Sequence, residues 1–306
     1  MVNINRNNFA VKTEKKFISL LRKEELGNIL EKYNIKVLKD QDPLEKVTPF
    51  IKVLSEINFQ TETKLNTWFF KHNYKGSSGV TKVIFHNNFD SEKPTFIFHH
   101  GIGESIHPLH LKALTNALFR NKFNTITIRA CNHDSIKEVL TKYINDFHNL
   151  TSSMASSVTA IEKVIQFHKN LSNEKVIVAG VSLGGIIASL HYFSFQSSDL
   201  YFPIIAYSDF SKIFLHKSYK SIIKNFDLLK KNKSIINCFS TSSKHKKNNK
   251  DIIYPILGEY DTMVDYTDSI KFWESYNTTV FDVGHHSIFL KKKEIMSLIE
   301  RKIKKA

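Results

Sequence analysis

From about residue 79, the chain alternates short apolar runs with longer stretches of helical periodicity. The runs are rich in Val, Ile, Phe and Thr, and they cover residues 79–86, 94–100, 124–130, 175–180, 202–208, 251–258 and 278–284. Helical spacing marks residues 147–165 and 183–190, and a last helix is expected over residues 287–304. Strands separated by helices predict an α/β fold, with a mostly parallel sheet covered by helices on both faces.

The first part of the chain has a different pattern. Asp42 suits a helix N-cap and Pro43 the first helical position. Four apolar residues then fall on one helical face: Leu44, Val47, Ile51 and Leu54. The pattern predicts a helical N-terminal extension over residues 1–78, followed by the α/β domain over residues 79–306. It assigns the extension no role beyond packing or forming part of a lid.

Composition narrows the protein class. The two cysteines, Cys131 and Cys238, form no CxxC pair, so we expect a reducing compartment and no structural zinc. The first residues lack the apolar core of a signal peptide, and the longest apolar run, residues 176–190, is too short to cross a bilayer. A cytoplasmic protein is therefore expected.

The formal net charge is +15, but most lysines are scattered and show no nucleic-acid-binding motif, so no nucleic-acid partner is expected. Residues 211–250 are the exception, with eleven lysines against the single acid Asp227. The segment is either a basic lid that contacts anionic substrates or surfaces, or a solvated insertion that reflects general lysine richness.

The motif Gly180-Val181-Ser182-Leu183-Gly184-Gly185 follows a predicted strand and precedes a predicted helix. A turn this abrupt strains the central residue and brings strand and helix too close for side chains at Gly180 and Gly184. It would raise the Ser182 hydroxyl above the sheet edge. The Leu183 amide, at the helix N-terminus, would face a developing oxyanion.

A serine nucleophile needs a base, and the base needs an acid to orient it. His285 follows the run 278–284, and Asp261 follows the run 251–258. The order Ser, Asp, His along the chain is that of one large fold family. Asp209 and Asp265 remain alternatives for the acid, and His286 for the base.

The loop His99-His100-Gly101-Ile102-Gly103 follows the run 94–100 and could supply the second oxyanion donor. Gly101 lets the backbone approach a substrate, which makes the Ile102 amide the candidate donor. The two histidines are not expected to bind a metal, because adjacent strand residues point to opposite faces.

Together, these motifs resemble the α/β-hydrolase superfamily over residues 79–306. The resemblance implies an eight-stranded, mostly parallel sheet with a cap after the sixth strand, where residues 209–250 would form a small helical lid. It implies Ser182 as nucleophile, His285 as base, Asp261 as acid, and the Ile102 and Leu183 amides as oxyanion donors. One loop departs from the family pattern: residues 129–135 read RACNHDS, where many members carry Asp and glycines.

The resemblance implies a serine hydrolase that cleaves a carboxylic ester or thioester of a small-molecule acyl substrate and needs no cofactor. Two alternatives stay open at this point. One is an acyltransferase with the same triad. The other is a non-catalytic protein of this fold that binds an anionic surface.

The two interpretations of residues 211–250 predict different salt responses. If the lysines attract substrate, kcat/KM for an anionic ester falls between 0.1 M and 1 M salt, where the Debye length shrinks from about 10 Å to about 3 Å. A neutral ester of equal length is the control. Replacing Lys244, Lys246 and Lys247 with Gln should reduce the difference, whereas equal salt responses in the wild type would leave the charge without a catalytic role.

Overall fold

The computed structural model describes residues 49–102, 121–135, 138–143, 147–207, 209–214 and 249–305, together with the single residues 12, 231, 236, 237 and 240. Most of the predicted N-terminal helices and most of the predicted lid therefore lie outside the described residues. The same holds for Asp42, Pro43, Leu44 and Val47.

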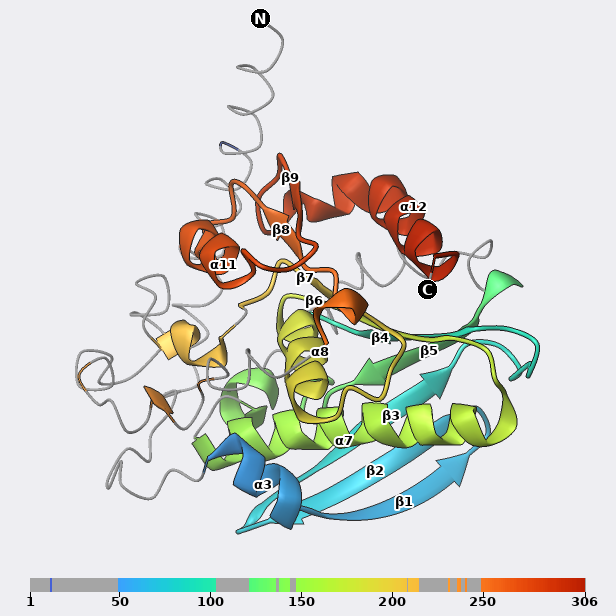
Figure 1. Cartoon of the computed structure of the whole chain (residues 1–306). Helices are drawn as coiled ribbons and strands as arrows, with labels where there is room; N and C mark the ends of the chain where they lie inside the picture. Colours follow the sequence, from blue (N-terminus) through green and yellow to red (C-terminus); the bar gives the residue numbers. More distant parts are fainter. Residues whose placement is uncertain are drawn as a thin grey trace, which may run out of the picture.

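Nine strands form one sheet in the order β1-β2-β3-β5-β4-β6-β7-β8-β9 (Figure 1). The strands are β1 Asn58–Lys64, β2 Thr67–Tyr74, β3 Ser77–Phe85, β4 Thr95–His99, β5 Asn124–Arg129, β6 Val176–Val181, β7 Leu200–Ile204, β8 Ile256–Gly258 and β9 Thr279–Phe281. From β5 across to β9 all neighbours are parallel, whereas β1, β2, β3 and β5 pair antiparallel. The sheet is therefore mostly parallel, as predicted, with nine strands rather than eight.

The prediction of a helical extension up to residue 78 is wrong for residues 58–78. These residues form β1, β2 and the start of β3, so the expected boundary at residue 79 falls inside a strand of the sheet. Two-residue turns connect the strands, and Lys75 and Gly76 have the positive φ values, 46° and 85°, that a type I′ hairpin turn requires. The Lys-Gly pair and the aromatic residues of β2 were the sequence signals for this arm of the sheet.

The described helices are α3 Phe50–Glu56, α7 Phe147–Leu171, α8 Leu183–Ser194, α11 Tyr266–Phe272 and α12 Lys292–Ile303. Short helical turns are η3 Val139–Tyr143, η4 Phe210–Phe214, η6 Lys250–Ile252 and η7 Ser287–Lys291. In α3, Phe50 and Val53 are buried, whereas Ile51, which was predicted to lie on the apolar face, is 43% exposed. The buried face of the helix therefore differs from the predicted one. Among the helices that the structure describes, none combines the length and hydropathy needed to span a membrane.

Two apolar cores lie on the two faces of the sheet. Along β6, Val176 and Val178 belong to the core that also contains apolar residues of α3, α7 and α8. Ile177, Ala179 and Val181 belong to the other core, together with residues of α12. Side chains that alternate along one strand are thus buried on both faces, which explains the continuous apolar runs in the sequence. Figure 1 shows α7 lying across β1–β3, with α3 beside it.

Helix α7 packs on the sheet through short hydroxyl side chains. Each of four buried serines pairs with one residue of the sheet or its loops: Ser152 with Ser77 (2.7 Å), Ser156 with Thr81 (2.7 Å), Ser153 with Cys131 (2.9 Å) and Ser157 with His99 (3.1 Å). Small residues allow the helix to approach the strands closely, and the hydrogen bonds satisfy the polar groups that this approach buries.

A second polar contact joins α7, α8 and β7. The ring of His191 is buried, its Nε2 donates to Glu162 Oε2 (3.1 Å), and its Nδ1 accepts from the Tyr201 hydroxyl (3.0 Å). Burial lowers the pKa of His191 from its usual 6.5, although the carboxylate opposes the shift. Burial would raise the pKa of Glu162, but the hydrogen bonds from His191 and Ser197 lower it instead.

We expect His191→Phe to lower the free energy of unfolding by about 1–3 kcal/mol at pH 7, because Glu162 and Tyr201 lose a buried partner. The wild type should also lose stability as the pH falls below 6.5, because the unfolded chain then binds a proton that folded His191 resists. The variant should lose less over this range. Urea unfolding between pH 5 and 8 measures both effects, with Lys163→Ala on α7, next to Glu162, as the control. Parallel pH profiles for variant and wild type would contradict the expectation.

Candidate active site

Ser182 lies at the abrupt turn between β6 and α8, with φ 54° and ψ −113°. Its amide donates to the Ile204 carbonyl of β7 (2.9 Å), which fixes the turn to the neighbouring strand. A Cβ on Gly180 would overlap the backbone of Gly184, and a Cβ on Gly184 would overlap the His99 carbonyl of β4. The close approach of α8 to β6 and β4 therefore requires both glycines, in agreement with the turn predicted from the sequence.

Three of the predicted residues form a continuous hydrogen-bonded chain. His285 Nε2 lies 2.9 Å from Ser182 Oγ, and His285 Nδ1 lies 2.8 Å from Asp261 Oδ2. The side chains of His285 and Asp261 are only 9% and 3% exposed. Ser182, Asp261 and His285 follow β6, β8 and β9, and they meet because parallel strands present their carboxyl ends at one edge of the sheet.

The Asp261 carboxylate is oriented by its own loop. Oδ1 accepts from the amides of Met263 and Val264, both at 2.8 Å, so Oδ2 is directed to the imidazole. The buried Tyr207 hydroxyl donates to the Met263 carbonyl (2.8 Å) and connects this loop to the segment after β7. A carboxylate facing Nδ1 places the ring proton there and leaves Nε2 as an acceptor toward the Ser182 hydroxyl.

The alternative residues have other partners. Asp265 is the N-cap of α11 and accepts from the Asp268 amide (2.9 Å). Asp209 accepts from the amide and hydroxyl of Ser211 and from the hydroxyl of Ser240. The ring of His286 packs edge-on against His285, with centroids 5.3 Å apart.

The two candidate oxyanion donors come from the loop after β4 and the start of α8. Gly101 is buried and Ile102 is 49% exposed, so the loop reaches the surface at this point. Leu183 is the first residue of α8, and its amide is one of the four that no carbonyl of the same helix can accept. His99 and His100, which precede Gly101, are both buried.

Among the described residues, neither a metal-binding cluster nor a reactive cysteine offers an alternative catalytic site. No group of three or more His, Cys, Asp or Glu residues among the described residues could hold a metal ion. Burial raises the pKa of Cys131 to about 12, which keeps it a thiol, and it donates to the Ser153 hydroxyl. A buried thiol of this kind is a poor nucleophile.

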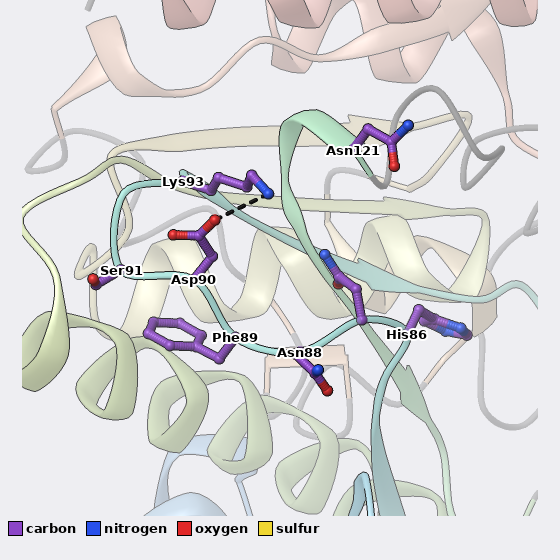
Figure 2. A pocket seen from close by; sticks show the side chains of 8 residues that line it. His86, Asn88, Phe89, Asp90, Ser91, Lys93 and Asn121 are labelled. Atoms are coloured by element: carbon purple, nitrogen blue, oxygen red, sulfur yellow. Dashed lines mark ion pairs between the residues drawn. The ribbon is translucent and has the colours of Figure 1, made fainter.

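A separate hollow of about 850 Å³ lies along the loop between β3 and β4 (Figure 2). This loop enters β4 at its amino end, so the hollow is at the sheet edge opposite to Ser182. Its polar groups hold the loop in place: Asn87 bonds the backbone of Phe123 and Thr125, and Asp90 pairs with Lys93 at 3.0 Å. The hollow therefore reflects loop structure rather than a second arrangement of reactive groups.

Solved structures show the same fold at low sequence identity. Est1E from Butyrivibrio proteoclasticus has a TM-score of 0.53 at 14% identity, covering 77% of this chain and 98% of its own. Acetyl xylan esterase 1 from a Thermoanaerobacterium species has a TM-score of 0.53 at 10% identity, covering 88% and 94%. An acylaminoacyl peptidase from Pyrococcus horikoshii has a TM-score of 0.55 at 11% identity, and this chain spans only 43% of its length.

No curated protein is similar enough in sequence to match the chain. One family model does match, over residues 129–303, which is more than half of the chain and includes Ser182, Asp261 and His285. The fold is that of the α/β-hydrolase superfamily, and the chain belongs to the uncharacterised protein family UPF0227.

Proposed function

We propose that this protein is a serine hydrolase that cleaves a carboxylic ester or thioester of a small-molecule acyl substrate through an acyl-enzyme intermediate. The observation that carries the proposal is the Ser182–His285–Asp261 chain, with heavy-atom distances of 2.9 Å and 2.8 Å, at a strained strand–helix turn. A strained backbone at a residue whose side chain joins a chain of hydrogen bonds is typical of a residue held for chemistry.

In the proposed acylation step, Ser182 Oγ forms a bond to the carbonyl carbon while its proton passes to His285 Nε2. The carbonyl oxygen becomes an oxyanion, which the Ile102 and Leu183 amides would bind. The bond to the leaving oxygen or sulfur then breaks, and the leaving group takes the proton from Nε2. Water repeats the sequence on the acyl-enzyme, releasing the acid and restoring Ser182.

Asp261 has two tasks in this scheme. It holds the Nδ1 proton, so that Nε2 faces Ser182, and its negative charge stabilises the imidazolium formed in each step. The two loop amides on Oδ1 keep the carboxylate in place while the ring charge changes. The names of the structural neighbours, two esterases and a peptidase, agree with acyl transfer to water.

Ser182→Ala should abolish ester hydrolysis, with a loss in kcat on the order of 10⁴–10⁶-fold, because the nucleophile is removed. It should also abolish labelling by a fluorophosphonate probe. Hydrolysis of p-nitrophenyl esters and acyl thioesters of graded length measures the loss and identifies the acyl preference. Ser189→Ala, which changes a buried serine of helix α8, is the matched control and should keep full activity. A folded Ser182→Ala protein with wild-type turnover would refute the assignment.

Asp261→Asn should lower kcat by about 10⁴-fold, because an amide keeps the shape of the site but favours the wrong imidazole tautomer. Asp265→Asn and Asp209→Asn should have little effect, because neither carboxylate bonds His285: Asp265 caps α11 by accepting from the Asp268 amide, and Asp209 accepts from two serines. His285→Ala should likewise be far more damaging than His286→Ala. If Asp209→Asn were the inactive variant, the acid would lie after β7 and the scheme would need revision.

A further inference from the structure

The doubled histidine before Gly101 forms two successive hydrogen bonds to the loop backbone. His99 Nδ1 lies 2.9 Å from the His100 carbonyl, and His100 Nδ1 lies 2.7 Å from the Gly101 carbonyl. Each ring therefore bonds the carbonyl of the residue that follows it. The two rings stack with centroids 4.9 Å apart, and both are buried.

The partners of the other ring nitrogens fix the tautomers. The Ala130 amide donates to His100 Nε2 at 3.0 Å, so the proton of the neutral ring is on Nδ1, where it is donated to Gly101. His99 Nδ1 faces a carbonyl oxygen, which can only accept, so this ring also carries its proton on Nδ1. Its Nε2 then accepts from the Ser157 hydroxyl of α7, which lies 3.1 Å away. Burial holds the pKa of His99 well below its usual value, which keeps this ring neutral.

The bond to the Gly101 carbonyl has a consequence for the next amide. The peptide between Gly101 and Ile102 is planar, and in a trans peptide the C=O and N–H groups point in opposite directions. A carbonyl that is held toward the buried His100 ring therefore directs the Ile102 N–H away from that ring. Glycine at position 101 offers no side chain that would otherwise restrict the rotation of this peptide.

The His100 ring is itself anchored outside the loop. Strand β4 ends at His99, so the sheet pairing does not extend to the backbone of Gly101 and Ile102. The bond from Ala130 connects the ring to the end of β5, and His133 packs beside it at 5.0 Å between centroids. The His100 ring thus connects the ends of β4 and β5 to the Gly101 carbonyl and holds in place a loop that is not paired in the sheet.

We propose that His100 is a positioning residue of the oxyanion hole, which holds the Gly101–Ile102 peptide so that the Ile102 amide is preorganised to bind the oxyanion. His99 acts one residue earlier by holding the His100 carbonyl. The proposal rests on the proposed serine-hydrolase function and assigns a task to the doubled histidine that neither the triad nor a metal requires.

Two substitutions separate the two bonds of His100. In His100→Asn, the side-chain amide nitrogen takes a place near Nδ1 and can still donate to the Gly101 carbonyl. In His100→Gln, the longer side chain reaches toward the Nε2 position, where its oxygen can accept from Ala130, but it leaves the Nδ1 position empty. The positioning role predicts that Asn preserves catalysis and that Gln does not.

We expect His100→Gln to lower kcat on the order of 10–100-fold, short of the 10²–10³-fold that removal of an oxyanion donor costs, because the amide remains but is less well aligned. KM should stay within about twofold, because the ground-state carbonyl uses the hole less than the transition state does. The affinity for a trifluoromethyl ketone, whose adduct with Ser182 carries an oxyanion, should fall by a factor similar to that of kcat.

His168→Leu is the matched control for lost buried hydrogen bonds. His168 is also a buried histidine bonded at both nitrogens, to Thr95 Oγ1 (2.7 Å) and the Glu174 carbonyl (2.7 Å), but it lies at the amino end of β4. The His168→Leu protein should be less stable than the wild type, but its kcat should not fall selectively as that of His100→Gln does. This variant also calibrates how far reduced stability alone lowers activity in the assay.

The wild type is first treated with a fluorophosphonate probe, and labelling of Ser182 is identified by mass spectrometry. An unlabelled wild type without esterase activity would overturn the proposed function and this inference with it. If the wild type is labelled and active, equal kcat for the Asn and Gln variants, or a loss confined to KM, would overturn only the positioning role. A selective loss of kcat and ketone affinity in the Gln variant, with recovery in the Asn variant, would support it.

Discussion

The close packing of helix α8 against strands β6 and β4 is the constraint on which the rest of the site depends. Without side chains at Gly180 and Gly184, the first turn of α8 lies directly against the backbone of both strands. The connecting residue, Ser182, is then forced to a positive φ and stands at the carboxyl edge of the sheet. The loops after β4, β8 and β9 meet at this same edge, so one backbone contact determines where all the reactive groups can assemble.

Several polar side chains near Ser182 bond the surrounding scaffold with one atom and a group of the proposed site with another. Asp261 uses Oδ1 for its own loop and Oδ2 for His285. His285 donates from Nδ1 to Asp261, which orients the ring, and presents Nε2 to Ser182. In the proposed oxyanion hole, His100 likewise bonds the end of β5 through one nitrogen and the Gly101 carbonyl through the other. Such division reduces the reorganisation needed when charge develops.

Buried polar contacts continue behind the site and account for the four buried serines of α7. Its serines bond residues of β3, the β5 loop and β4, and Ser157 reaches His99 directly. The hydrogen-bonded His99 ring is therefore held between the helix and the loop. Apolar side chains in these positions would fill the core equally well, but they would not fix the direction of the loop carbonyls, because dispersion contacts have little directionality.

The sequence by itself determined the alternation of strands and helices from residue 79 and the turn at Ser182, because local periodicity and glycine spacing act over a few residues. It also narrowed the acid and the base to a few positions after strands. It did not lead to the strands within residues 58–78, because β1 is mostly exposed and its few less exposed positions gain a common face only when the strand pairs with β2. Only the tertiary structure showed that Asp261, and not Asp209 or Asp265, contacts His285, and that the paired histidines bond Ser157 and Ala130. The contacts among Ser182, His285 and Asp261, and those from the two histidine Nε2 atoms, join residues 24 to 103 positions apart in the chain. Strand order, and not local sequence, brings such residues together.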